Sequence, residues 1–206
     1  MTIDTRQRLR LVDPTTQPVA ADFVGAPRLR DLSNKRVGLI DDSKLNAREL
    51  LEEVVSLLDS RFGVASVDYH RKPSASKPAS PETIERLARE CDYVVVGVGD
   101  RSSCSACSVH DGVHVEKAGT PTATICTDAF VEASRSMAAM WEAPNYPVIF
   151  TGHPIGSLTA AQLREIDEIE GGDARGHAVE LHTAEQAPFD HEVDEPLLLD
   201  DVQHES

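Results

Sequence analysis

The fold of this chain is decided by the stretch Asp92-Tyr93-Val94-Val95-Val96-Gly97-Val98-Gly99. A short, nearly continuous run of valines is typical of a strand buried on both faces of a parallel sheet. The run leads directly into Asp100-Arg101-Ser102-Ser103-Cys104-Ser105-Ala106-Cys107, and we expect a helix from about Cys104 to Ala118 that is ended by Gly119. A buried strand followed at once by a helix is the repeating unit of an α/β fold.

Similar patterns alternate on both sides of this unit. Apolar runs and helical periodicity predict strands at 37–40, 64–69, 122–127 and 147–151 and helices at 46–59, 81–90 and 129–140. Thr159 and Gln162 have the spacing of a capping box for a last helix to about residue 169, and 178–182 is a weak edge strand. The alternation predicts a mostly parallel β-sheet with helices on both faces, a Rossmann-like three-layer sandwich.

Composition divides the chain into three parts. Residues 1–34 lack periodicity and predict an N-terminal arm, residues 35–170 form the α/β domain, and residues 171–206 form an acidic C-terminal tail. Residues 164–206 hold fourteen acidic and two basic residues, so they carry −12 of the net charge of −15. Such a block is typical of a solvated or disordered segment, and it disfavours a nucleic-acid partner because it repels phosphates.

The sequence also indicates the cellular compartment of the protein. No stretch approaches the roughly 20 consecutive apolar residues that cross a membrane, and the first residues lack the apolar centre of a secretion signal. We therefore expect a cytoplasmic protein with no membrane partner. The four cysteines are too few for a disulfide scaffold, so in a reducing compartment we expect thiols, and we expect no cofactor.

Cys104 and Cys107 are the residues that we expect to carry chemistry. Cys104 falls in the first turn of the predicted helix, where free backbone N–H groups and the helix dipole favour a thiolate over a thiol. Cys107 is spaced to form a disulfide with Cys104, or to resolve an intermediate after Cys104 has attacked a substrate. The alternative is that both are small buried side chains that fill space beneath a loop.

His110 and His114 lie one turn apart on the same helix. With Cys104 and Cys107 they offer four ligands of the kind that zinc selects, so a metal site at Cys104, Cys107 and His110 is an alternative function. Structural zinc sites usually take ligands from two separate elements, and we therefore favour no metal. His110 is instead a candidate base, or a hydrogen-bond partner of the Cys104 thiolate, and a histidine packed against the sheet is the alternative.

Ligands of such folds bind beyond the carboxyl ends of the strands. The loops expected to gather there are 41–44, 70–78, 99–104, 127–130 and 152–157. Lys72, in a Pro- and Ser-rich loop, is a candidate to hold a carboxylate or phosphate of a substrate, and an exposed flexible loop is the alternative. The other substrate-binding candidates are Asp100, Arg101, Ser103, Thr127 and His153.

Several motifs point to a known family: Lys72-Pro73-Ser74-Ala75, Gly97-Val98-Gly99-Asp100, Cys104 with Ser108-Val109-His110-Asp111, Glu116-Lys117-Ala118-Gly119 and His153-Pro154-Ile155-Gly156. On these motifs the chain resembles the UGSC family of bacterial selenoproteins and their cysteine homologues, over about residues 30–165. It is more distantly similar to the selenoprotein subunits of the glycine and proline reductases. The resemblance implies attack of a thiol or selenol on a small substrate, with cleavage of a carbon-heteroatom bond.

In this resemblance the selenocysteine position falls on Arg101, the glycine falls on Ser102, and the cysteine is kept as Cys104. We expect a cysteine-dependent enzyme that attacks a small anionic substrate with the Cys104 thiolate, in a redox or bond-cleaving reaction, within a homo- or hetero-oligomer. Alternatively, Arg101 binds an anion at the old reactive position, or the chain is a noncatalytic or co-catalytic subunit of an oligomeric enzyme.

Overall fold

The computed structural model describes residues 23–159 and residue 162. Strands and helices alternate along this part of the chain, in the order β1 (Lys35–Asp41), α1 (Ala47–Phe62), β2 (Val64–Arg71), α2 (Pro81–Glu90), β3 (Tyr93–Gly99), α3 (Ser102–Lys117), β4 (Thr122–Thr127), the 3-10 turn η1 (Asp128–Phe130), α4 (Val131–Met140) and β5 (Val148–Thr151). The predicted last helix and edge strand lie outside the described residues, except that Gln162 Oε1 accepts a hydrogen bond from Thr159 N at 2.9 Å, as in a capping box.

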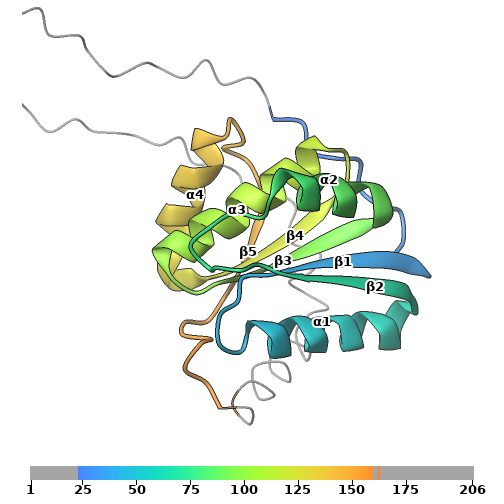
Figure 1. Cartoon of the computed structure of the whole chain (residues 1–206), viewed down its shortest axis with the longest axis horizontal. Helices are drawn as coiled ribbons and strands as arrows, with labels where there is room; N and C mark the ends of the chain where they lie inside the picture. Colours follow the sequence, from blue (N-terminus) through green and yellow to red (C-terminus); the bar gives the residue numbers. More distant parts are fainter. Residues whose placement is uncertain (1–22, 160–161, 163–206) are drawn as a thin grey trace, which may run out of the picture. The chain divides into compact units, whose positions relative to one another are not determined.

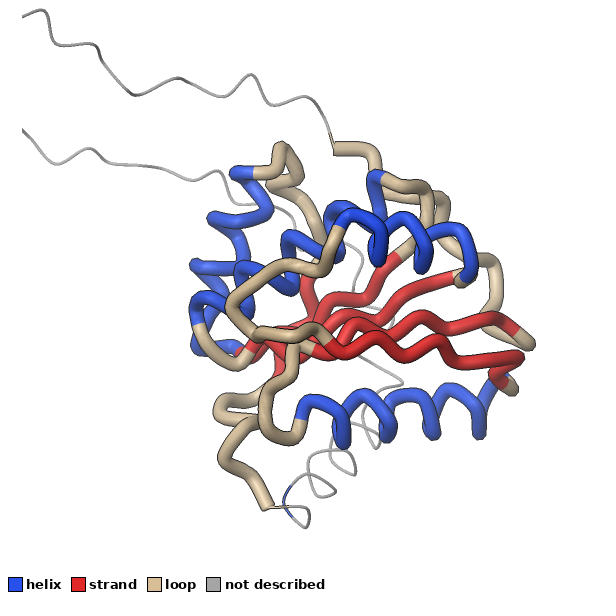
Figure 2. Tube along the Cα trace, viewed as in Figure 1, coloured by secondary structure: helices blue, strands red, loops and turns tan. Residues whose placement is uncertain are grey.

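The five strands form one parallel sheet in the order β2-β1-β3-β4-β5. One face of the sheet is covered by α1 and the other by α2, α3 and α4 (Figures 1 and 2). The structure therefore confirms the three-layer α/β arrangement. From β1 the chain continues outward to β2, and from β3 it continues outward in the opposite direction to β4 and β5. The switch point of the sheet therefore lies between the neighbouring strands β1 and β3.

The central strands β1 and β3 supply side chains to both faces of the sheet. Val37, Leu39 and Val95 pack in the core that includes residues of α1, whereas Val94 and Val96 pack in the core that includes residues of α2. Successive side chains of a strand point to opposite faces, and here each face is covered by helices. This double burial is why the valine run of β3 is continuous rather than alternating.

Close packing of α3 on the sheet depends on two glycines. A Cβ atom at Gly99 would come within 2.6 Å of Ser105 Cα, and one at Gly112 would come within 2.1 Å of the Tyr146 hydroxyl oxygen. The first turn of α3 therefore lies directly against the end of β3. This contact fixes the position of the turn that carries Cys104.

The ends of two helices show how the sequence sets their boundaries. Ser80 caps α2, because its Oγ accepts a hydrogen bond from Thr83 N at 3.2 Å, and Pro81 occupies the first position of the helix. Gly119 follows the end of α3 with a φ of 97°, a conformation that favours glycine. These caps set where the chain leaves each helix for the next strand.

The described end of the predicted arm, residues 23–34, packs on the same domain. Ala26 N donates to Glu116 Oε2 at 2.6 Å, and Arg28 forms an ion pair with the same carboxylate, also at 2.6 Å. Leu29 and Leu32 pack against the core on the α1 face. Among the described residues, no helix has both the length and the apolar character that a membrane span requires.

Candidate functional site

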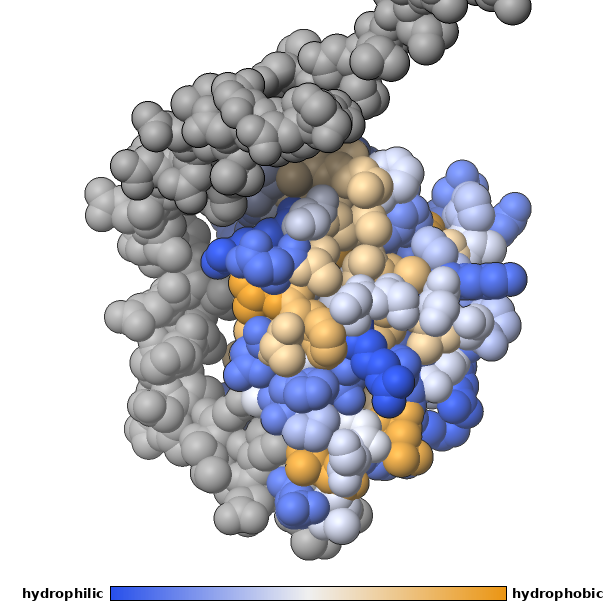
Figure 3. Space-filling model, turned by 90° about the vertical axis from the view of Figure 1, so that its left-hand side faces the viewer, coloured by the Kyte–Doolittle hydropathy of each residue, from blue (hydrophilic) through white to orange (hydrophobic). Residues whose placement is uncertain are grey.

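A pocket of about 630 Å³ lies at the carboxyl edge of the sheet. Its volume is in the range of small-molecule sites. The lining residues come from the loops that follow β1, β3, β4 and β5: Lys44, Leu45, Asp100, Arg101, Ser102, Phe130, His153, Pro154, Gly156 and Ser157. The loops after β1 and β5 lie on the left of Figure 1, the side that faces the viewer in Figure 3, where hydrophilic and hydrophobic residues lie side by side. Four of the five predicted loops therefore meet at one pocket.

The pocket presents positive charge. Neither Lys44 nor Arg101 forms an ion pair within the described part of the chain. The carboxylate in the wall, Asp100, is already bonded by Ile155 N at 3.1 Å and by Gly156 N at 2.8 Å. The cations are therefore the groups left to bind a ligand, and they favour an anionic one.

Asp100, Thr127 and His153 form a hydrogen-bonded group beside the pocket. His153 Nδ1 lies 3.0 Å from Asp100 Oδ1 and 3.2 Å from Thr127 Oγ1. These residues end or follow three different strands, β3, β4 and β5. Sequence reasoning predicted each of them as a site residue from its position after a strand, and the structure brings all three together.

Cys104 lies beneath the pocket wall. It is the third residue of α3, as expected for a first-turn cysteine, and its sulfur accepts hydrogen bonds from Asp100 N at 3.2 Å and Arg101 N at 3.1 Å. As a thiol it is also placed to donate to Arg101 O at 3.3 Å. Cys104 is fully buried, whereas Arg101 and Ser102 line the pocket. The sulfur thus holds in place the turn that forms the wall.

The other three cysteines are buried free thiols. Burial raises the pKa of Cys91 to about 11 and the pKa of Cys126 to about 12. Burial also raises the pKa of Cys107, one helical turn after Cys104. These three side chains are therefore protonated at neutral pH.

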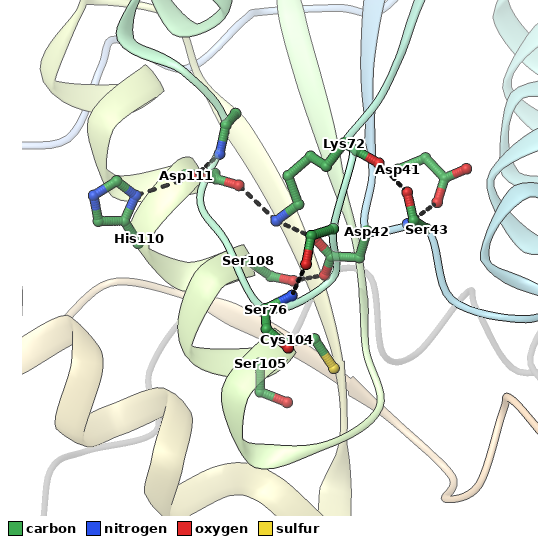
Figure 4. A network of polar contacts seen from close by, with 12 residues as sticks. Asp41, Asp42, Ser43, Lys72, Ser76, Cys104, Ser105, Ser108, His110 and Asp111 are labelled. Carbon is green, nitrogen blue, oxygen red and sulfur yellow. Dashed lines mark hydrogen bonds and ion pairs between the residues drawn. The ribbon is translucent and has the colours of Figure 1, made fainter.

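Lys72 lies in a buried ionic cluster, not in the pocket (Figure 4). Its ammonium is fully buried, lies 2.8 Å from Asp111 Oδ2, and pairs with Asp42 on its other side. Ser108 donates to Asp42, and Ala79 N donates to Asp111 Oδ1 at 3.0 Å. The expectation of an exposed flexible loop is therefore wrong at Lys72, and the ammonium that we expected to hold a substrate anion is paired with two carboxylates inside the protein.

The cluster is electrostatically coupled. Burial raises the pKa of Asp42 to about 6, although Lys72 acts in the opposite direction. Burial lowers the pKa of Lys72, but the carboxylates of Asp42 and Asp111 outweigh burial, so the net shift is upward. Lys72 therefore stays charged at neutral pH, and the cluster ties the loop after β2 to α3.

His110 is not the partner of Cys104 that we expected. Its Nδ1 lies 3.1 Å from Asp111 Oδ1, on the opposite side of Asp111 from Lys72 (Figure 4). Its ring stacks on His114 with the centroids 4.0 Å apart, and both rings meet Trp141 edge to face. His110 thus packs on side chains of α3 and the end of α4, and not against the sheet as the alternative expected. Ser103, the remaining predicted residue, is exposed and is not part of the pocket lining.

The described residues offer no ligand set for the alternative metal function. Within 23–159 and 162, no three His, Cys, Asp or Glu side chains are grouped so that they could hold a metal ion. The Cys104 sulfur is bonded at the start of α3, while His110 and His114 pack against Trp141. The cysteine and histidine side chains of α3 therefore lie in different surroundings.

Sequence reasoning missed several residues of the pocket and the cluster. Lys44, Leu45 and Phe130 line the pocket, and each lies within four residues of the end of a strand. Position after a strand is the signal that the sequence offers for these three side chains, and it indicates their loops without singling out the side chains. Asp42 directly follows β1, but its position does not indicate a pairing with Lys72, and Ser108 carries no signal for its hydrogen bond to Asp42.

Fold and site together define an α/β protein with a pocket at the carboxyl edge of its parallel sheet, whose wall includes residues at the start of a cysteine-bearing helix. The chain belongs to the UGSC family, whose family model matches residues 10–169. The search of curated proteins found no match. The more distant similarity to reductase subunits stays a prediction.

Proposed function

We propose that the chain is an enzyme that binds a small anionic molecule in the pocket and attacks it with the thiolate of Cys104. One observation carries the proposal: the N–H groups of Asp100 and Arg101 donate to the Cys104 sulfur at 3.2 and 3.1 Å. N–H groups directed at a sulfur in the first turn of a helix stabilise its anionic form. The residue that donates one of these bonds, Arg101, also lines the pocket.

The charges around the pocket support an anionic substrate. Lys44 and Arg101 come from two different loops, so they can hold a carboxylate or phosphate between them. Leu45, which is 72% exposed, and Phe130 add apolar surface to the same pocket. A small organic anion fits this combination better than a bare inorganic ion, because it uses both kinds of surface.

In the proposed step, the Cys104 sulfur forms a bond to a carbon atom of the substrate. The bond from that carbon to its heteroatom breaks, and the heteroatom leaves with the electron pair. Within the described part of the chain no backbone N–H donates to the Cys107 sulfur, and burial raises the pKa of the Cys107 thiol, so Cys107 lacks the support that the two N–H donors give to Cys104. Because Cys104 is fully buried, the turn at 100–104 must open toward the pocket for the attack.

The burial of Cys104 favours a second candidate function, that of a noncatalytic binding subunit. Arg101 stands where the family resemblance places the reactive residue, and Arg101 rather than a cysteine lines the pocket. In this version the sulfur of Cys104 only holds the turn, and an oligomeric partner supplies the reactive group. Both candidates require the same anion-binding pocket, and they differ in whether Cys104 reacts with the bound anion. One experiment that measures the reactivity of Cys104 can therefore separate them.

Alkylation with a charged and a neutral reagent provides this test. Iodoacetate is a small carboxylate from which a thiolate displaces iodide, and iodoacetamide is its neutral counterpart. Mass spectrometry measures the rate of each reagent at Cys104, and the ratio of the two rates is divided by the same ratio in urea. We expect this normalised ratio to be about 10, where a value of one means no preference for the anion. It should fall toward one in R101M and stay high in R135M, where the arginine is exposed on α4.

The other outcomes are equally informative. If Cys104 stays unmodified while the native protein binds propionate through Arg101, the noncatalytic subunit is the correct candidate. If Cys104 reacts with both reagents without any preference for the anion, the pocket does not direct substrates to the thiol. If neither modification nor binding occurs, the pocket is not the functional site.

A further inference from the structure

His153 is held by a carboxylate that can only accept hydrogen bonds. Asp100 Oδ1 lies 3.0 Å from His153 Nδ1 and accepts from Ile155 N at 3.1 Å, while Oδ2 accepts from Gly156 N at 2.8 Å. Two backbone donors thus fix the orientation of the carboxylate. A carboxylate paired with Nδ1 places the imidazole proton on that nitrogen.

The opposite ring nitrogen is then an acceptor. With the proton on Nδ1, the neutral ring carries its lone pair on Nε2. No residue in the described part of the chain forms a hydrogen bond with Nε2. The side chain is 35% exposed and lines the pocket, and Phe130 holds the ring edge to face with the centroids 5.3 Å apart. The pocket therefore contains one oriented acceptor beside two cations.

We propose that the pocket selects a small hydroxycarboxylate, with the carboxylate bound by Arg101 and Lys44 and the hydroxyl donated to His153 Nε2. An aminocarboxylate fits less well, because its ammonium would be repelled by the two cations. The inference rests on the proposed function, since it needs the anion-binding pocket, and it adds the chemical class of the ligand.

A matched pair of probes tests the inference. Lactate and propionate are both monovalent carboxylates and differ in one hydroxyl. Calorimetric titration at about pH 8, where imidazoles are generally neutral, should give about fivefold tighter binding of lactate, the effect of one net hydrogen bond. In H153F both probes should bind equally, because phenylalanine keeps the ring and removes the acceptor. The control H70F changes a histidine of β2 and should keep the preference for lactate.

A measurement on the unaltered protein does not depend on folding of the variant. Nitrogen-15 NMR of the histidine rings should show His153 protonated at Nδ1, with the Nε2 resonance moving when lactate is added and moving less with propionate. An Nε2-protonated ring overturns the inference. Equal binding of both probes through Arg101 also overturns the inference, but this outcome still supports the anion-binding pocket of the proposed function. Binding of neither probe removes the pocket itself, and the inference with it.

Discussion

The Lys72 ammonium lies 2.8 Å from the Asp111 carboxylate, and both side chains are completely buried. The two residues are 39 positions apart in the chain, so the contact joins the loop after β2 to the middle of α3. A buried charge is tolerated only when partners satisfy it. This ion pair therefore holds the loop in place over the edge of the sheet.

Removal of the ammonium should destabilise the fold. In K72M the carboxylates of Asp42 and Asp111 lose their common cation inside the protein, and we expect a loss of about 3–5 kcal/mol in the free energy of unfolding. Urea denaturation measures the change. The matched control is K77M, an exposed lysine of the same loop, which should stay within about 0.5 kcal/mol of the wild type. A similar small effect for K72M would show that the buried pair contributes little.

The free energy of unfolding should depend on pH through the protonation of Asp42. Its pKa is raised by burial to about 6, above its usual value of 3.8, so the folded state binds this proton more tightly than the unfolded state. The stability from this group is present below about pH 4 and is lost as the pH rises through 6. Relative to D42N, the wild type should lose about 3 kcal/mol over this window.

The comparison with D42N is needed because other groups titrate in the opposite sense. The Arg36 guanidinium, for example, lowers the pKa of Asp92. Thermal or urea unfolding of both proteins across the window gives the difference directly. A difference that does not vary with pH would mean that Asp42 titrates as an ordinary carboxyl.

Packing at Gly112 should tolerate no side chain. In G112A the new methyl group would meet the Tyr146 hydroxyl at 2.1 Å, where that oxygen is held by Thr122 and Thr124 at 2.6 Å each. We expect a loss of about 1–3 kcal/mol in the free energy of unfolding, although alanine favours helix. In G152A the Cβ meets nothing within 4 Å, so this variant is the control. Equal stability of the two variants would contradict the packing of α3 on β4.

The buried thiols should be inert in the folded protein. At about pH 8 only about one Cys91 thiol in a thousand is ionised, and fewer of Cys126, because burial raises their pKa values to about 11 and 12. Mass spectrometry after brief treatment with iodoacetamide should show both unmodified in native protein and both modified in urea. Rates at these positions that match the rates in urea would show that the core opens readily.

The layers of the fold were predictable because each strand is a short apolar run flanked by turn residues. The start of α3 was predicted two residues too late, since the helix begins at Ser102 rather than at Cys104. Its N-cap is Arg101, which does not have the side chain of a usual cap. The sulfur of Cys104 accepts from the N–H of Arg101 instead, and this contact is not recognisable as a cap in the sequence.

The site was predictable only where position after a strand was sufficient. Asp100, Arg101 and His153 follow β3 and β5, and all three line the pocket. Lys72 also follows a strand, yet it is buried by carboxylates from distant parts of the chain. A single sequence gives the position of a charge but not of its partners, so an internal lysine and an exposed one look alike.

Arg101 is held by its backbone alone. Its N–H donates to Cys104 Sγ at 3.1 Å and its carbonyl accepts from Ser105 N at 2.8 Å, and neither contact involves the guanidinium. Any residue with a backbone N–H could occupy this place with the same support. The side chain at position 101 and the scaffold that carries it are thus separable: its exchange changes the chemistry of the pocket wall and leaves the architecture around it as it was.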